Sequence, residues 1–359
     1  MADEEKTEIK PEAKREVKAA LERSSDAAIA RARRDLAIRT GALVGGLVVV
    51  VVVINIFSNG AFLTPGNLTN VLRQITYNAI LAIGQTFVII TAGIDLSVGS
   101  LIELTGVVMA QFANAMPFSG FPLIVATLVV GVAVGCTAGL VNALPVVRLN
   151  LPPFITTLAM MLMARGLAFK LANGRPIALN SNAFDGMGTG FLFEDILHRV
   201  GLPGIPIAVL WMAVLVAVFA IILIRTPFGR YVFAIGGNEE AARLAGINVK
   251  LIKTAVYVIS GGCAAIAGLL YMARFASGSP NTGIGSELQS IAAVVVGGTS
   301  LAGGRGSVIG TFFGALLIGL LNNVMNLLNI ESYTQDIVLG AVILLAVIVD
   351  ELRKRYLSR

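Results

Sequence analysis

Residues 230–253 read RYVFAIGGNEEAARLAGINVKLIK and interrupt a chain whose other long segments are mostly apolar. Asn238 is suited to the N-cap of a short helix, and the acidic pair 239–240 favours the positive end of the helix dipole. Gly246 can adopt the left-handed conformation that ends many helices. The stretch therefore predicts a helix of about two turns with a defined start and end.

This predicted helix carries a narrow apolar face, because Ala241, Leu244 and Ala245 follow i, i+3, i+4 spacing. A helix this short is not stable by itself and cannot span a bilayer. We therefore expect it to dock on a partner.

Composition indicates an integral membrane protein. Of 359 residues, 56% are hydrophobic and only 13% are charged, whereas soluble domains carry about 25% charged residues. The net charge of +6 reflects Lys and Arg crowded into certain loops, which favours membrane orientation and not nucleic-acid binding. Residues 1–40 carry both charges without secretory signal character, so they predict a cytoplasmic tail before a transmembrane domain over 41–355.

Apolar runs that could span a membrane, alone or with a neighbour's help, predict about ten crossings. They cover 41–57, 71–92, 97–115, 122–147, 153–172, 206–224, 251–273, 288–302, 307–329 and 335–349. With the basic cluster of 31–39 in the cytoplasm, an even count places the C-terminus and the basic residues of 225–253 there too. The expected fold is an all-α membrane protein with both termini cytoplasmic and a long external loop over 173–205.

Glycines suggest close helix packing and two mobile turns. Pairs four residues apart, Gly131 with Gly135, Gly135 with Gly139 and Gly310 with Gly314, let membrane helices approach closely. Two Gly-rich turns, TAGIDLSVGS at 91–100 and VGGTSLAGGRGS at 296–307, follow apolar runs entered from the same side. Such breaks at corresponding positions point to a translocation path, although a tight turn capped by Asp95 explains the first equally well.

Polar residues inside the apolar runs are candidates to line a path, because such residues are costly in a membrane unless they face protein or water. The path candidates are Asn78, Gln85, Asp95, Ser97, Glu103, Asn322, Asn323 and Asn326. Asn142 and Arg165 are also polar residues within these runs. Amides outnumber charges, which suits a neutral hydroxylated solute better than an ion. The sequence contains no GxxxxGK[ST] phosphate loop, catalytic triad or metal-binding cluster, so it predicts neither an enzyme nor a metalloprotein.

Three segments closely resemble the ribose-type sugar permeases of ABC importers. They are GIDLSVGS at 93–100, GRYVFAIGGNEEAARLAGINV at 229–249 and ELQSIAAVVVGGTSLAGGRGSVIGTFFGALLIGLLNN at 287–323. The resemblance extends over roughly 45–355 and implies a type II-like importer fold of ten helices. Glu103 departs from the family pattern, which tends to a small or apolar residue there; a carboxylate at this position could bind a solute hydroxyl or pair with Arg165.

The resemblance also implies function and partners. It implies a non-catalytic permease in the bacterial cytoplasmic membrane that moves a monosaccharide by alternating access. The partners implied are a second, identical chain, an external sugar-binding protein and a cytoplasmic ATPase that holds the ATP and Mg²⁺, so this chain itself needs no cofactor. The coupling loop, 226–250, would contact the ATPase through Asn238, Glu239, Glu240, Arg243, Leu244 and Gly246.

Two other functions stay open at this point. Permeases for branched-chain amino acids or nucleosides share parts of the second Gly-rich motif. A secondary transporter or channel would need an ion-coupling or selectivity constellation, and the sequence offers none.

Overall fold

The structure is a computed structural model that describes residues 51–52, 54–56, 58, 60–199 and 204–357. The chain divides into two compact units, 1–60 and 61–359. In the first unit, residues 51–52 and 54–56 are helical. The rest of the predicted crossing at 41–57 and the predicted tail at 1–40 lie outside the described residues.

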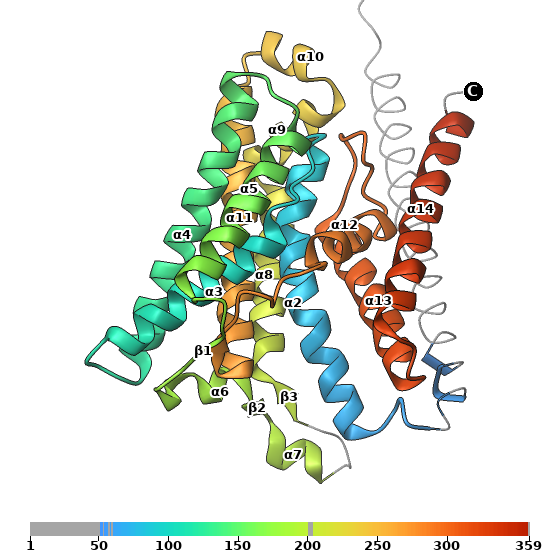
Figure 1. Ribbon diagram of the computed structural model, residues 1–359. Coiled ribbons are helices and arrows are strands. Elements are labelled where there is room, and N and C mark those ends of the chain that lie inside the picture. Colours follow the sequence, from blue (N-terminus) through green and yellow to red (C-terminus); the bar gives the residue numbers. More distant parts are fainter. Residues whose placement is uncertain (1–50, 53, 57, 59, 200–203, 358–359) are drawn as a thin grey trace, which may run out of the picture. The chain divides into compact units, whose positions relative to one another are not determined.

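The second unit is almost entirely helical (Figure 1). Its longer helices are α2 (Pro65–Ile90), α3 (Val98–Ala115), α4 (Phe121–Arg148), α5 (Pro153–Leu171), α8 (Ile207–Arg225), α9 (Pro227–Gly237), α11 (Val249–Phe275), α12 (Ser286–Val296), α13 (Val308–Leu327) and α14 (Ser332–Leu357). The short helices are η1 (Asn182–Phe184), α6 (Asp185–Gly188), α7 (Glu194–His198) and α10 (Glu239–Leu244). Two antiparallel pairs join strands of two residues: β1 (Ile177–Ala178) with β4 (Ser277–Gly278), and β2 (Phe191–Leu192) with β3 (Ile205–Pro206).

Seven of the described helices are long and apolar enough to cross a membrane: α3, α4, α5, α8, α11, α13 and the Ser332–Leu352 part of α14. Each has at least 18 residues, a rise of about 27 Å, close to the thickness of a hydrocarbon core. The predicted all-α membrane fold is therefore confirmed, and the chain is a multi-pass membrane protein. The total of ten crossings stays a prediction.

The helix predicted at 288–302 is shorter than expected. α12 covers only Ser286–Val296, 11 residues, or about 16 Å, which is too short to cross a membrane alone. It ends because Gly297 and Gly298 follow, the latter at φ +88°, a left-handed conformation that terminates helices. The helix predicted at 71–92 starts earlier than expected, because Pro65 opens α2 in the first helical turn, where proline is well tolerated. α2 is not among the seven described helices that are apolar enough to cross a membrane, so this crossing stays a prediction.

The two ends of the second unit carry different elements (Figure 1). α10 and the C-terminal end of α14 lie at one end, whereas the short strands, α6 and α7 lie at the other. This arrangement agrees with the prediction that the 225–253 segment and the C-terminal helix end share a side opposite the 173–205 loop. Which side faces the cytoplasm stays a prediction.

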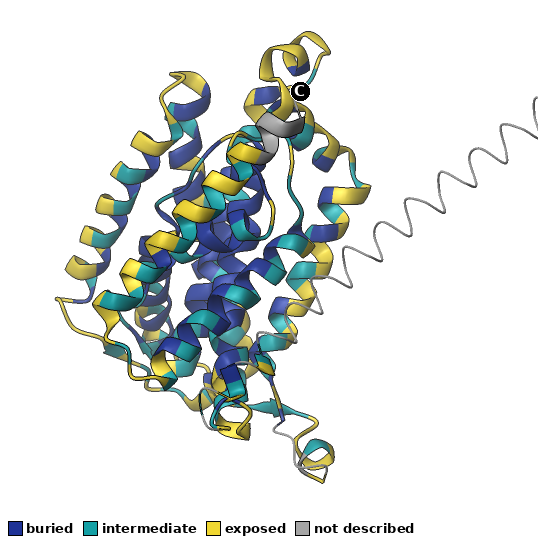
Figure 2. Ribbon diagram, turned by 90° about the vertical axis from the view of Figure 1, so that its right-hand side faces the viewer, coloured by how far each residue is buried: buried dark blue, intermediate teal, exposed yellow. Residues whose placement is uncertain are grey.

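Buried residues concentrate in the middle of the bundle, and the outer helix faces are exposed (Figure 2). The glycine pairs pack as predicted: a Cβ at Gly135 of α4 would overlap the carbonyl oxygen of Gly261 on α11, and one at Gly139 would overlap that of Tyr257. On α13, Gly314 meets the carbonyl oxygen of Ala293 on α12 in the same way. Direct backbone contact therefore fixes α4 against α11 and α13 against α12.

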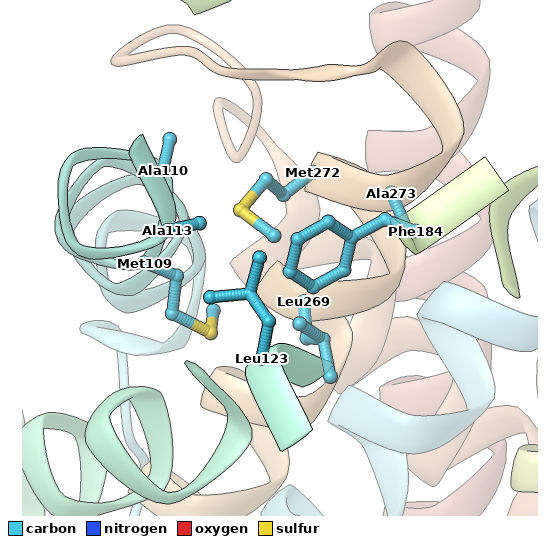
Figure 3. Close-up of a cluster of buried hydrophobic side chains, with 8 residues drawn as sticks. All are labelled: Met109, Ala110, Ala113, Leu123, Phe184, Leu269, Met272 and Ala273. Carbon is cyan, nitrogen blue, oxygen red and sulfur yellow. The ribbon is translucent and has the colours of Figure 1, made fainter. Parts of the chain in front are cut away.

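At the end that carries the short strands, apolar side chains from three helices and the 173–205 loop close the core (Figure 3). The cluster comprises Met109, Ala110, Ala113, Leu123, Phe184, Leu269, Met272 and Ala273. Phe184 of η1 is 1% exposed, so this part of the loop is anchored in the bundle and does not lie free on its surface.

Candidate coupling and translocation sites

The short polar helix has the boundaries that the sequence predicts. The Asn238 side chain accepts a hydrogen bond from the Ala241 amide at 2.9 Å, and Glu239 and Glu240 occupy the first turn of α10. Gly246 adopts φ +85°, as expected for the residue that ends the helix. The helix is six residues long.

The apolar face of α10 is left uncovered. Ala241, Leu244 and Ala245 are exposed, and Leu244 reaches 81% exposure, whereas Ala242 is buried toward the bundle. A large apolar side chain exposed among charges favours a protein contact. The six predicted coupling residues, Asn238, Glu239, Glu240, Arg243, Leu244 and Gly246, all lie on or beside this helix.

Two ion pairs involve α10, and one of them joins it to α11. Glu239 Oε2 lies 2.6 Å from the Lys253 ammonium on α11, and Glu240 pairs with Arg243 within the helix. A cavity of about 460 Å³ lies beneath α10, between the end of α4, α9 and the start of α11. The helix is thus tied to α11 by one ion pair and borders this cavity.

The two Gly-rich turns meet at α9, immediately before α10. The Gly304 amide donates a hydrogen bond of 2.9 Å to the carbonyl oxygen of Ile90 at the end of α2. A Cβ at Gly236 of α9 would overlap that same oxygen and would lie 2.5 Å from the Gly304 nitrogen. We call this backbone contact of Ile90, Gly236 and Gly304 the glycine junction. The sequence predicted that the two turns occupy corresponding positions. It did not predict that the turns contact each other and α9.

Asp95 is the centre of a buried hydrogen-bond network between α3, α4 and α11. Its Oδ1 accepts from the Ser97 amide at 2.9 Å and from the Ser97 hydroxyl at 2.6 Å, and its Oδ2 accepts from Ser260 at 2.8 Å. Asn142 donates to the Ser97 hydroxyl at 2.8 Å. Asp95, Ser97 and Ser260 are each at most 1% exposed, so the carboxylate joins α3 to α11, and Asn142 adds α4 through Ser97.

Gln85 joins the same network from α2. The Gln85 side-chain amide, oriented to satisfy both bonds, donates from its nitrogen to the backbone carbonyl oxygen of Asp95 at 3.3 Å. Its oxygen accepts from the backbone amide of Asp95 at 3.1 Å. Three of the predicted path residues, Gln85, Asp95 and Ser97, are therefore brought together. Ser260 was missed because a lone serine in an apolar helix gives no sequence signal.

Glu103 and Arg165 form an ion pair across α3 and α5, with Arg165 Nε 3.1 Å from Glu103 Oε2. The sequence left this pairing open as one of two alternatives for Glu103. Glu103 is fully buried, and the Arg165 side chain is 26% exposed.

The remaining path candidates do not converge on one place. Asn78 donates to Gln289 of α12 at 2.8 Å, and Asn323 exchanges hydrogen bonds with Asn67 at 2.8 and 3.0 Å. Asn322 is buried. Asn326 is exposed and accepts from Gln335 at 2.9 Å. Which of these side chains meet a solute stays a prediction.

Comparison with known sequences identifies the family. The family described as "Branched-chain amino acid transport system / permease component" matches residues 67–347. The chain belongs to this family. That match covers the glycine junction, α10 and the Asp95 network, so the candidate sites lie in the part of the chain that defines this permease family.

Within the permease family, the chain is similar to sugar permeases. It is 43% identical over 309 residues to the ribose import permease protein RbsC of Haemophilus influenzae, covering 85% of this chain and 90% of that protein. RbsC of Escherichia coli strain K12 is 44% identical over 312 residues, 86% and 92% of the two chains. The xylose transport system permease protein XylH of Haemophilus influenzae is 37% identical over 363 residues, which cover 86% of this chain and 96% of that protein. The resemblance to ribose-type permeases is thus confirmed. No solved structure matches the chain.

Proposed function

We propose that this chain is the membrane-spanning subunit of an ABC importer for a monosaccharide, either a ribose-like pentose or a hexose. The observation that carries the proposal is the identity of 43–44% with ribose import permeases over about 85% of the chain. The xylose permease relative supports a monosaccharide more generally. The natural setting is the bacterial cytoplasmic membrane, with α10 and both termini on the cytoplasmic side.

The energy for transport would come from a partner ATPase that binds ATP and Mg²⁺ and docks on α10. The exposed Leu244 side chain and the charges around it offer a docking surface. Movement of α10 would pass through α9 to the glycine junction, and from there to the turns before α3 and α13. Alternating access follows when the two ATPase states favour different positions of these turns.

Two further partners complete the proposed importer. Six large apolar residues of α14 are exposed along the helix: Ile337, Leu344, Leu345, Ile348, Val349 and Leu352. A second, identical chain or membrane lipid would cover such a face. The loop at 173–205 lies at the end opposite α10 (Figure 1) and is the proposed landing surface for an external sugar-binding protein.

Reconstitution tests the proposed function. The chain is placed in liposomes with its ATPase and binding protein, and uptake of radiolabelled monosaccharides is measured with and without internal ATP. We expect uptake of at least one monosaccharide only with ATP, and none with an ATPase variant that cannot hydrolyse it. ATP-independent uptake would contradict the proposal. Uptake of branched-chain amino acids or nucleosides in place of sugars would favour the alternative function, a permease for those solutes. The description of the matching family names branched-chain amino acids.

A further inference from the structure

Three charged side chains from three helices lie near one face of α3 in the second unit. They are Glu103 of α3, Arg165 of α5 and Glu287 in the first turn of α12. Glu103 is fully buried and Glu287 is 9% exposed. We call these three residues the charged triad. Burial of two carboxylates with one guanidinium costs free energy, so some other interaction or a function must account for their presence.

The position of Glu287 follows from its contact with Gly99. A Cβ at Gly99 would overlap Oε2 of Glu287, so this carboxylate lies directly on the surface of α3. Gly99 precedes Glu103 by four residues, and residues four apart share one helix face about 6 Å from each other. Both carboxylates therefore lie along the same face of α3, and Arg165 contacts the one on Glu103.

Each member of the triad has a buried polar atom that makes no hydrogen bond of good geometry within the described residues, although the Gly283 amide lies near the Glu103 carboxylate. These atoms are Glu103 Oε1, Arg165 Nη2 and Glu287 Oε2. An unpaired buried polar atom costs about 1–3 kcal/mol, and more for charged groups. Three such atoms in one cluster call for hydrogen-bond partners from outside the chain, which water or a polar solute could provide.

Arg165 shows from which side such a molecule can arrive. α5 contributes few buried residues, since Thr156, Thr157, Met160, Ala164 and Ala168 alone are buried. Arg165 lies beside this stripe, and about a quarter of its side chain is exposed. A guanidinium is costly against hydrocarbon, so this side of α5 faces water, solute or another protein chain.

We propose that the charged triad binds the hydroxyl groups of the transported solute, a neutral polyhydroxylated molecule, as it passes along α5. This inference rests on the proposed function. A hydroxyl both donates and accepts, so it can satisfy either free carboxylate oxygen or the free guanidinium nitrogen. The triad has a formal charge of −1, which disfavours an anion, and the proposed function selects a neutral hydroxylated solute over a cation.

The conformation described here keeps the triad closed. A Cβ at Gly283, in the segment before α12, would overlap the carbonyl oxygen of Gly99, so backbone contact seals the segment against α3. Separation of α12 from α3 would break this contact and open the carboxylates to the path. Solute therefore reaches the triad only in another state of the transport cycle.

The test uses the complete importer in liposomes, with uptake and ATP hydrolysis measured side by side. Glu103→Leu removes the hydrogen-bonding atoms and should lower initial uptake by about tenfold or more. ATP hydrolysis stimulated by the loaded binding protein should stay within about twofold, because the substitution leaves the exposed residues of α10 that would contact the ATPase unchanged. Glu103→Gln retains an acceptor and should recover part of the uptake. Glu331→Gln, an exposed position between α13 and α14, is the matched control and should transport like the unsubstituted chain.

A second measurement tests the hydroxyl contact itself. For two transported sugars that differ by one hydroxyl, Glu287→Gln should narrow the ratio of their uptake rates by about threefold or more. Unchanged uptake in Glu103→Leu, or an equal loss of uptake, ATP hydrolysis and thermal stability, would overturn the assignment of the triad. If the unsubstituted importer carries no monosaccharide, the proposed function itself fails.

Discussion

Ser260 of α11 donates a hydrogen bond of 2.8 Å to Oδ2 of Asp95, 165 residues earlier in the chain. Both side chains are at most 1% exposed, so water cannot replace this bond without opening the bundle. The contact joins the first Gly-rich turn to the helix that follows α10. It therefore links a turn that is predicted to move to α11, the helix with which α10 forms an ion pair.

Substitution of Ser260 by Ala should destabilise the protein. The change leaves Asp95 Oδ2 without its donor, at a cost of about 1–3 kcal/mol. The expected result is a lower melting temperature of the purified protein in detergent. Ser119→Ala, an exposed position between α3 and α4, should leave the melting temperature unchanged. An unaltered melting temperature in Ser260→Ala would mean that the bond contributes little.

Substitution of Asn238 by Ala should loosen α10 while the rest of the fold remains. The Ala side chain cannot accept the hydrogen bond from the Ala241 amide, and loss of an N-cap costs about 1 kcal/mol. Amide hydrogen exchange over residues 239–245 should speed up by about fivefold. Asn238→Ser retains a capping oxygen and should exchange at nearly the original rate. Equal exchange in the Ala and Ser variants would contradict the capping role.

Substitution of Leu244 by Ser should weaken the proposed docking of the ATPase. The side chain is 81% exposed, so its replacement removes no internal packing, whereas loss of an apolar anchor from an interface weakens binding by about tenfold. Affinity for the ATPase can be measured by titration in nanodiscs. Ile196→Ser on α7, where the side chain is 64% exposed, is the matched control at the opposite end. Equal affinities for all three chains would place the docking surface elsewhere.

Substitution of Gly135 by Ala should separate α4 from α11. The added Cβ would overlap the carbonyl oxygen of Gly261, which belongs to the backbone and cannot rotate away. Such overpacking costs about 1–3 kcal/mol. Gly340→Ala on α14 adds the same methyl group where no atom lies within 4 Å and should not destabilise the protein. Thermal unfolding of both variants in the same detergent measures the difference.

The sequence predicted those structural elements that depend on neighbouring residues alone, such as helices and their ends. Apolar runs predicted most of the long helices, Asn238 and Gly246 predicted the ends of α10, and Gly131, Gly135 and Gly139 predicted close helix packing. The end of α12 at Val296 agrees with the Gly-rich turn predicted at 296–307, whereas the apolar run predicted at 288–302 extended too far because the Gly297–Gly298 pair stops the helix.

Contacts between distant segments could not be predicted from local patterns. Nothing near Asp95 indicates Ser260 as its partner, and nothing near Gly236 indicates Ile90 and Gly304. The amides grouped as path candidates share a composition but lie in different parts of the bundle, as Asn78 and Asn326 show. Residue type indicates that a side chain needs a polar neighbour, but only the packing of helices determines which one.

The glycine junction has a mechanical consequence. Ile90, Gly236 and Gly304 meet through backbone atoms, so no rotatable side chain is present to absorb a shift of α9. A displacement of α9 larger than the slack in one hydrogen bond must move both turns together. The two turns are therefore coupled through backbone atoms, so that neither can shift independently of the other while these contacts persist.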